Sequence, residues 1–271
     1  MFVIEPSVKY EMGTPRLIFD KLAMPSPVRG LSRPRLISVL QSSLQTCTST
    51  ILSGRAGAGK TTLAADFARR CGSAVAWYKV DAPDGDMAVF FEYLTACIRQ
   101  KRPSFGSQRL LHLFSTYADE QPALLAESFV YELLESGSEP LLIVIEDLHL
   151  VCDSAWVVPF FRRLLPLLPA EIHVLITSRT MPLALWRMRS KQTVAVLDDE
   201  ALTFTRQEAI ELFEADGLSA EEACIAFDHS HGRAAALASL ASALKASKRN
   251  GNSGGGHRRL ASQNRTRSTL R

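Results

Sequence analysis

Eight consecutive residues have the types and the spacing of a phosphate-binding loop: Gly54-Arg55-Ala56-Gly57-Ala58-Gly59-Lys60-Thr61. They fit the pattern G-x-x-x-x-G-K-S/T. Glycine permits positive φ angles and a close approach of the backbone to an anion, so that successive N–H groups point inward at phosphate. We expect Lys60 to reach the β- and γ-phosphates of a nucleotide and the Thr61 hydroxyl to hold Mg²⁺. Thr62 supplies the next hydroxyl, which is placed to touch an inner phosphate.

The flanking segments place this loop between a strand and a helix. A β-branched run at 48–52 precedes it, and apolar residues recur at helical spacing over 63–71. Strand, loop and helix in this order are the context that the motif requires. The following helix directs the positive end of its dipole at the loop, which favours an anion there. A Gly/Ala-rich surface turn before an ordinary helix is the less favoured interpretation.

Two carboxylates, Glu146 and Asp147, follow the most apolar run of the chain, at 141–145. Five continuous apolar residues predict a strand covered on both faces, as in a parallel sheet with helices on each side. A nucleotide hydrolase needs carboxylates at the end of such a strand, one to hold Mg²⁺ and another to orient or deprotonate the attacking water. Glu146 and Asp147 are candidates for both tasks, and the division between them is open. The alternative is an acidic turn after a core strand.

Strand and helix patterns alternate along the chain. Further strands are predicted at 74–80, 172–177 and 192–197, and helices from about 34 and at about 86–101, 123–135 and 154–168, whereas 102–122 has no clear pattern. Each connection is long enough for a crossover, which predicts an α/β fold: a P-loop NTPase type of parallel sheet with helices on both faces, followed by a small helical subdomain. Ligands of such sheets bind beyond the carboxyl ends of the strands, where the loop, Asp81, the acidic pair and Ser178-Arg179 all fall.

Further side chains are candidates for contacts with a nucleotide, each with a structural alternative. Arg179, directly after a predicted strand, would sense the γ-phosphate or stabilise the charge that develops on it; otherwise it is a surface arginine. Arg33 and Arg35 would contact the base, or only solvate the helix that begins there. His149 lies just past Asp147, but a lone histidine in a loop is more often structural.

Charge and cysteine patterns limit the classes of partner. The formal net charge is +3, but segment 245–271 holds eight of the 31 Lys and Arg residues and no Asp or Glu. The first 244 residues are therefore net acidic, which argues against a basic nucleic-acid groove there. The five cysteines are widely spaced, as is typical of reduced thiols in the cytoplasm. Because no run approaches ~20 apolar residues, we expect a soluble cytoplasmic protein without a signal peptide or membrane contact.

Composition divides the chain into four parts. Residues 1–30 contain four prolines without a sustained period and are predicted to form an irregular N-terminal arm. Residues 31–200 form the P-loop nucleotide-binding domain, and residues 201–244 a small helical subdomain with a capping-box sequence at 205–208. Residues 245–271 predict a basic disordered tail, because their Gly, Ser and Arg cannot form a core.

The ordered series of motifs resembles the STAND class of signalling ATPases, and within it the maltose-activator-like branch of large ATP-binding LuxR-type transcriptional regulators. The resemblance covers about residues 20–242. Only the loop is specific by itself. The matching segments are Arg33-Pro34-Arg35-Leu36, the loop at 54–61, Ala76-Trp77-Tyr78, Ile145-Glu146-Asp147-Leu148-His149, Thr177-Ser178-Arg179, the segment 182–189 and Leu202-Thr203-Phe204-Thr205.

The resemblance implies a resting state that holds ADP, exchange for ATP when an inducer binds, and self-association of the ATP-bound form. It matches Lys60 and Thr61 to phosphate and Mg²⁺ positions, Glu146 and Asp147 to the acidic pair, and Arg179 to a nucleotide-sensing position. The family usually has Asp-Asp where this chain has Glu146-Asp147. The metal ligand would then be longer by one methylene, so we expect altered or weak turnover.

Members of this branch continue through a winged helix, a helical-repeat sensor and a C-terminal DNA-binding helix-turn-helix, before which this sequence stops. We therefore expect a truncated product or a stand-alone module, without sequence-specific DNA binding by this chain alone. The leading function is a slowly hydrolysing ATP switch with an unidentified inducer or regulatory protein. Two alternatives stay open: a P-loop kinase that phosphorylates a small molecule or a polynucleotide, and a nucleotide-binding module without hydrolysis.

Overall fold

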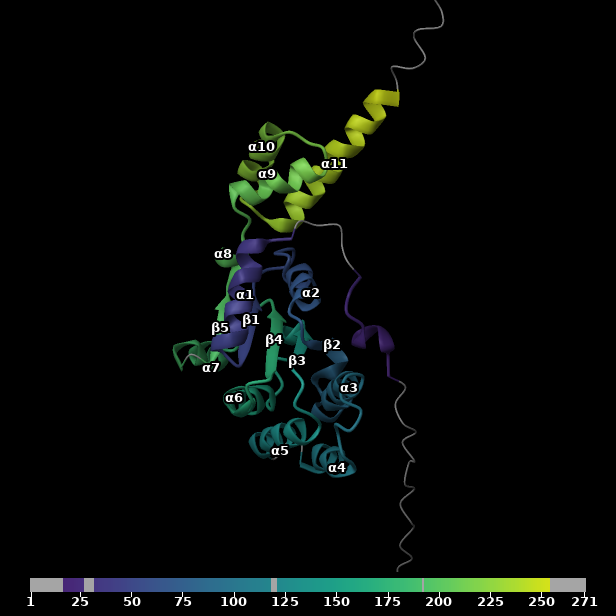
Figure 1. The fold of residues 1–271 in the computed structure, drawn as a ribbon, viewed down its shortest axis with the longest axis vertical. Helices are drawn as coiled ribbons and strands as arrows, with labels where there is room; N and C mark the ends of the chain where they lie inside the picture. Colours follow the sequence, from purple (N-terminus) through teal and green to yellow (C-terminus); the bar gives the residue numbers. More distant parts are fainter. Residues whose placement is uncertain (1–16, 27–31, 118–120, 192, 254–271) are drawn as a thin grey trace, which may run out of the picture.

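The structure, a computed structural model, describes residues 17–26, 32–117, 121–191 and 193–253 of the 271-residue chain. Five parallel strands form a sheet in the order β2-β3-β4-β1-β5 (Figure 1). They are β1 (Ser49–Ser53), β2 (Ala74–Lys79), β3 (Leu141–Glu146), β4 (Ile172–Ser178) and β5 (Val194–Leu197). The parallel sheet predicted from the sequence is confirmed. β4 separates β1, which leads into the glycine loop, from β3, which ends at the acidic pair.

Side chains alternate along the strands between two apolar clusters, one on each face of the sheet. Leu142 and Val144 of β3 pack with α1 and α2, whereas Ile143 and Ile145 pack on the opposite face. Helices therefore cover both faces, as the apolar run at 141–145 predicts. The first face carries α1 (Pro34–Thr46) and α2 (Lys60–Arg70); the second carries α3 (Met87–Arg99), α4 (Gln108–Tyr117), α5 (Pro122–Glu135), α6 (Val157–Leu167) and α7 (Leu183–Trp186).

Four phenylalanines on the second face form an aromatic cluster: Phe91, Phe114, Phe129 and Phe160. Phe91 stacks on Phe114 with ring centroids 3.8 Å apart and meets Phe160 edge-on at 4.6 Å. Phe114 belongs to α4, which forms within the segment that has no clear pattern in the sequence. Packing of its apolar face on the cluster stabilises this helix.

The helical subdomain stands at the carboxyl edge of the sheet, beyond the ends of β1 and β4 (Figure 1). It comprises α9 (Arg206–Ala215), α10 (Ala220–Ser230) and α11 (Ala234–Ser253), whereas α8 (Asp199–Leu202) precedes it and packs on the sheet domain beside β5. The capping box predicted at the start of α9 is formed: Glu208 N–H donates to the Thr205 hydroxyl at 3.1 Å, and Thr205 N–H donates to the Glu208 carboxylate at 2.9 Å. Phe213 and Leu237 are fully buried in the subdomain's own core.

The last helix departs from expectation. α11 continues to Ser253, past position 245, where we predicted that a disordered tail begins. Lys248 pairs with Glu222 at 2.8 Å, and Lys245 pairs with Asp216. These ion pairs tie the extension to the rest of the subdomain, and it continues a helix whose first half is rich in Ala, the best helix former. Residues 254–271 of the predicted tail lie outside the described part of the chain.

Part of the predicted irregular arm also has local structure. Residues 19–22 form a 3₁₀ turn, η1 (Phe19–Leu22), that packs against β2 and α3. Residues 1–16 and 27–31 of the arm are outside the described ranges. Among the described residues, no helix is both long enough and apolar enough to cross a bilayer.

Candidate functional site

Glycines shape the loop between β1 and α2. Gly57 and Gly59 have φ angles of 79° and 85°, in the left-handed region that favours glycine. Gly59 is the N-cap of α2, so the positive end of the helix dipole faces the loop. A Cβ atom added at Gly57 would lie 2.8 Å from the Cβ of Ala235, and the Gly57 carbonyl accepts a hydrogen bond from Ala235 N–H at 2.9 Å. The loop thus has the backbone of a phosphate cradle, with the start of α11 packed against it.

The ammonium group of Lys60 is held by the loop itself. Its Nζ donates to the carbonyl oxygens of Gly54 at 2.5 Å and of Arg55 at 3.0 Å. Burial is the main cause that lowers the pKa of Lys60; Asp147 opposes this shift and Arg179 adds to it. The site therefore holds a poorly solvated cation next to inward-facing backbone, which is an arrangement that an anion stabilises.

Glu146 is buried, and both of its carboxylate oxygens have hydrogen-bond partners. The Thr61 hydroxyl donates to Oε1 at 2.5 Å, and the Trp77 indole N–H donates to Oε2 at 3.1 Å. Thr61 comes from the first turn of α2, Glu146 from the last position of β3 and Trp77 from the interior of β2. The hydroxyl and one of the carboxylates predicted to hold Mg²⁺ are therefore in direct contact, and the indole fixes the carboxylate's orientation.

Asp147 has a different environment from its neighbour. Its φ of 60° is left-handed, a conformation that Asp tolerates better than most residues. Its N–H donates to the Thr177 hydroxyl at 3.1 Å, which ties the end of β3 to β4. Its carboxylate is 29% exposed and lies 3.8 Å from Nδ1 of His149. Two adjacent carboxylates are thus separated into a buried one and an accessible one.

His149 and Arg179 share the electrostatic surroundings of the acidic pair. Both ring nitrogens of His149 are buried and have no hydrogen-bond partner among the described residues. Burial is the main cause that lowers its pKa; Asp147 opposes this shift, and Arg179 and Lys60 add to it. A neutral imidazole with an unused donor and acceptor beside the loop is a polar group that a ligand or its water would satisfy.

The arginines near the loop bind carboxylates from much later in the chain. Arg55 Nε donates to Asp199 Oδ2 at 2.8 Å, and Arg55 N–H donates to Oδ1 at 2.9 Å. Arg33 and Arg35 both pair with Glu208, at 3.0 and 3.3 Å, and donate to carbonyls that precede α9. Arg33 lines the cavity in front of the loop, whereas Arg35 is outside its lining. The predicted contact of Arg35 with a base stays a prediction.

A cavity of about 480 Å³ lies in front of the loop. This volume is within the usual range of ligand pockets, roughly 300–1,000 Å³. Its walls come from the loop and α2, from the N-terminal arm, and from the helical subdomain. They include Gly57, Gly59, Thr61 and Thr62; Pro25, Ser26, Ser32 and Arg33; and Phe204, Leu212, Ala234, Ala235 and Ala238.

The donor set beside this cavity fits a magnesium ion that arrives with a nucleotide. Mg²⁺ prefers oxygen ligands and usually combines one or two protein oxygens with phosphate oxygens and waters. Thr61 and Glu146 supply such oxygens at the end of the cradle. Within the described ranges, no group of three or more His, Cys, Asp or Glu side chains is placed to form a metal cage of its own.

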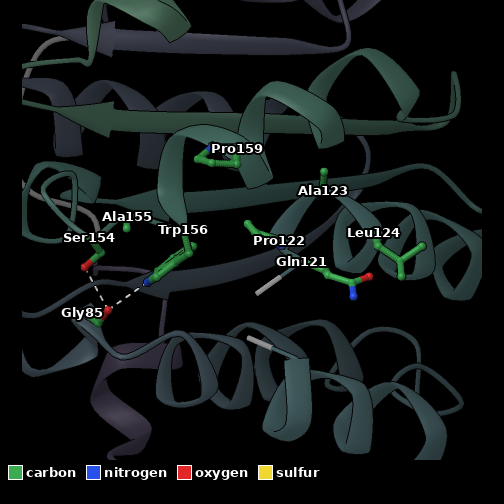
Figure 2. A pocket seen from close by; sticks show the side chains of 9 residues that line it. All are labelled: Gly85, Gln121, Pro122, Ala123, Leu124, Ser154, Ala155, Trp156 and Pro159. Carbon is green, nitrogen blue, oxygen red and sulfur yellow. Dashed lines mark hydrogen bonds between the residues drawn. The ribbon is translucent and has the colours of Figure 1, made fainter. Parts of the chain in front are cut away.

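A second cavity, of about 930 Å³, contains none of the predicted site residues (Figure 2). It lies between the start of α5, the segment before α6 and the end of η2 (Ala82–Gly85). The Gly85 carbonyl there accepts hydrogen bonds from the Ser154 hydroxyl and the Trp156 indole, each at 2.9 Å. These bonds hold the segment after β2 against α6, so they are explained by the fold.

Three residues near the loop were not predicted as site residues from the sequence: Trp77, Asp199 and Glu208. Trp77 appears in a motif of the resemblance, but nothing in the sequence indicates its bond to Glu146. Asp199 bonds Arg55, which is 144 positions earlier in the chain, and Glu208 bonds Arg33, which is 175 positions earlier. No local sequence pattern predicts either pair. Such contacts depend on how the subdomain packs on the sheet.

Comparisons with known proteins agree with this geometry. The HTH-type transcriptional regulator MalT of Yersinia pestis (strain Pestoides F) is 32% identical over 201 residues, which are 73% of this chain and 22% of that protein. MalT of Serratia proteamaculans is 30% identical over the same shares. The chain therefore spans less than a quarter of the length of these curated relatives. No protein-family model matches the chain.

A solved structure shows the same fold. The Walker-type ATPase PABY2304 of Pyrococcus abyssi superposes with a TM-score of 0.51, covering 85% of this chain and 76% of that one, at 12% sequence identity. The glycine loop, the parallel sheet and the sequence relatives lead to one assignment. The chain is a P-loop ATPase module related to the MalT-type transcriptional regulators.

Proposed function

We propose that this chain is a nucleotide switch that binds ATP or ADP with Mg²⁺ and hydrolyses ATP slowly. The observation that carries the proposal is the 2.5 Å contact between the Thr61 hydroxyl and the Glu146 carboxylate at the end of the glycine loop. A hydroxyl and a buried carboxylate beside a phosphate cradle are what a nucleotide-bound magnesium ion requires.

The geometry supports separate roles for the two carboxylates. Glu146, fixed by Thr61 and Trp77, would hold the metal, which when bound neutralises charge on the phosphates. Asp147, accessible and next to His149, would orient the attacking water or accept its proton. We propose this division for the two tasks that the sequence leaves unassigned between Glu146 and Asp147.

Two cations would act on the phosphates. Lys60 would exchange its bonds to the Gly54 and Arg55 carbonyls for bonds to the β- and γ-phosphates, so the carbonyls hold it in place until a ligand arrives. Arg179, whose charge already acts on Lys60 and His149, would stabilise charge on the γ-phosphate.

The helical subdomain would change its position in response to the nucleotide bound at the loop. Ala235 donates directly to the loop, and Glu208 of α9 holds Arg33 and Arg35 on the sheet side, so the subdomain's position depends on what the loop contains. The names of the relatives suggest that such a module serves a transcriptional regulator. We further propose a cytoplasmic location, an unidentified inducer, and self-association of the ATP-bound form, without sequence-specific DNA binding by this chain alone.

Calorimetry on the full chain tests nucleotide binding. The parent protein should bind ATP and ADP in the presence of Mg²⁺, and Lys60→Ala should weaken binding by about 100-fold, since it removes a charge-assisted contact in a desolvated place. Lys79→Ala, which alters an exposed lysine at the end of β2, is the matched control and should bind as the parent does. A folded parent protein with no affinity for either nucleotide contradicts the proposal.

Phosphate release separates the switch from the two alternatives. We expect slow ATP turnover that Asp147→Asn abolishes, without dependence on an added hydroxyl acceptor. Turnover at background in the parent and in Asp147→Asn alike would indicate a binding module without hydrolysis. Phosphorylation that depends on an acceptor would indicate a kinase.

A further inference from the structure

One wall of the cavity comes from a segment far from the loop in sequence. Pro25 and Ser26 of the N-terminal arm line the same cavity as Gly57, Thr61 and Thr62. Phosphates bound to the loop would fill the end formed by residues 57–62. The nucleoside would then extend toward the end bounded by the arm. Figure 1 shows this segment, in purple, descending beside α2 to η1 next to β2.

The arm is attached to the sheet domain at two places. Near the cavity, the Arg69 guanidinium of α2 donates to the Pro25 carbonyl and also, at 3.1 Å, to the Ala65 carbonyl of its own helix. Farther away, Leu22 is buried in the core and Ile18 N–H donates to the Tyr93 hydroxyl at 3.2 Å. Residues 17–26 are therefore fastened at both ends.

The second attachment centres on a buried ion pair. Lys21 Nζ donates to Asp84 Oδ1 at 2.7 Å and to Oδ2 at 3.0 Å, with 9% of Lys21 and 1% of Asp84 exposed. Asp84 Oδ2 also accepts from the Tyr78 hydroxyl at 2.9 Å and from Asp81 N–H at 2.8 Å. The ammonium lies 4.7 Å from the centroid of the Tyr93 ring. The hydrogen bonds from Tyr78 and Asp81 fix the Asp84 carboxylate, which in turn holds the Lys21 ammonium.

A buried ion pair of this kind is suited to fixing the position of the chain segment that carries it. Desolvation of two charges offsets much of their mutual attraction, so a buried ion pair adds little net stability over an apolar pair of the same shape. Its hydrogen bonds, however, permit one geometry for Lys21 at the surface of β2. The chain leaves Lys21 and reaches the cavity wall at Pro25 within a few residues, so the position of the wall depends on that of Lys21.

We propose that residues 17–26 form a strap across the nucleoside end of the cavity, and that Lys21 and Asp84 are positioning residues that hold the strap in place. The inference rests on the proposed nucleotide binding and extends it to the part of the ligand beyond the phosphates. The strap slows the departure of a nucleoside di- or triphosphate by enclosing its base and ribose. It does not contribute to binding of the phosphates, because the loop at 54–61 lies at the other end of the cavity.

The test uses the full chain with a paired substitution, Lys21→Met together with Asp84→Asn. Removing both charges avoids leaving a lone buried carboxylate, which would unfold the protein. Two ligands are compared by calorimetry in the presence of Mg²⁺: ADP, which has a nucleoside, and inorganic tripolyphosphate, which has none. Stopped-flow release of ADP carrying a fluorophore on its ribose gives the dissociation rate. Leu164→Ala, which shortens a buried side chain of α6, controls for general loss of stability.

We expect the paired variant to bind ADP about tenfold more weakly than the parent, mainly through faster dissociation, and to bind tripolyphosphate as the parent does. Leu164→Ala should leave both ligands unchanged in the folded protein. Unchanged ADP affinity and an unchanged ADP dissociation rate in the paired variant would contradict the strap proposal. An equal loss of affinity for ADP and for tripolyphosphate would also contradict it, because it would mean that the substitutions destabilise the whole binding site. Failure of the proposed function is distinguishable, because the parent itself would then bind no ADP.

Discussion

The aromatic cluster and the junction between the loop and the helical subdomain hold neighbouring elements together by different chemistry. In the cluster, rings from α3, α4, α5 and α6 contact one another without polar partners, and all four are almost fully buried. At the junction, the polar contacts are the ion pairs Arg33–Glu208 and Arg35–Glu208 and the hydrogen bond from Ala235 N–H to the Gly57 carbonyl.

This difference indicates which part of the molecule can rearrange when a ligand binds. Apolar burial is non-directional and is lost only when the rings separate. A polar contact exchanges one partner for another with a small net change in free energy. A bound phosphate offers such a partner to the loop, so we expect rearrangement at the junction while the aromatic side of the sheet stays fixed.

The largest effect is expected in the aromatic cluster. Phe91→Ala should lower the free energy of unfolding by about 4 kcal/mol, because it removes a buried ring and leaves a cavity. Denaturant unfolding gives this value, and nucleotide affinity of the folded fraction should not change. Tyr131→Ala, on the exposed face of α5, is the control and should have little effect. If Phe91→Ala lowered the free energy of unfolding by less than about 1 kcal/mol, the aromatic cluster would not be the fixed side of the sheet that we contrast with the junction.

Acid should weaken the face of the sheet that α1 and α2 cover, through His173 of β4. Its ring bonds the Thr50 hydroxyl of β1 at 2.9 Å, and that hydroxyl bonds Ser43 of α1, at the end of the sheet away from the loop. Burial lowers the pKa of His173 from 6.5 to about 4. Between these values the unfolded chain binds the proton more readily than the folded protein does, so stability falls as the pH drops, by up to ~3 kcal/mol.

Unfolding midpoints measured from pH 7 to pH 4 check this, with His173→Gln as the comparison. The parent should lose more stability than the variant over that range. Parallel pH profiles for the two proteins would show that the imidazole is not buried in its neutral form.

At the junction, Glu208→Gln should have an intermediate effect. The change removes the charge that holds Arg33 and Arg35, which we expect to lower the free energy of unfolding by about 2 kcal/mol and to speed ADP release several-fold. Glu222→Gln is a matched control, because Glu222 occupies the same capping-box position in α10 but is far from the loop. If both variants release ADP at the parent's rate, the junction does not respond to the nucleotide.

The smallest effect should come from Trp77→Phe. This variant keeps an aromatic ring in the core, though a smaller one, and loses the indole bond to Glu146 Oε2. We expect the Mg²⁺ concentration for half-maximal ATP binding to rise about fivefold, equivalent to ~1 kcal/mol, with nucleotide affinity in EDTA unchanged. Trp156→Phe, which loses an indole bond to Gly85, serves as the control. An unaltered Mg²⁺ dependence would mean that Thr61 alone orients the carboxylate.

Local signals predicted the parts of this molecule that local physics determines. The apolar run at 141–145 predicted a strand covered on both faces, and the glycine spacing at 54–61 predicted the turn into α2. The sequence could not predict α4, whose helix depends on packing of Phe114, nor the extent of α11. The ion pairs Arg33–Glu208 and Lys21–Asp84 could not be predicted from the sequence either, because pairs between distant positions leave no periodic pattern. The roles of the predicted site residues stay predictions that the variants above examine.

The fit between Gly57, Gly59 and the first turn of α11 has one more consequence. A Cβ atom at Gly57 would lie 2.8 Å from Ala235, and one at Gly59 would lie 3.3 Å from Ala234. A methyl group would thus clash at Gly57 and be crowded at Gly59. Whereas the ion pairs hold the subdomain at the junction, the size of the side chains at these positions limits how near α11 comes to the loop, so an added carbon at Gly57 would push the helix away.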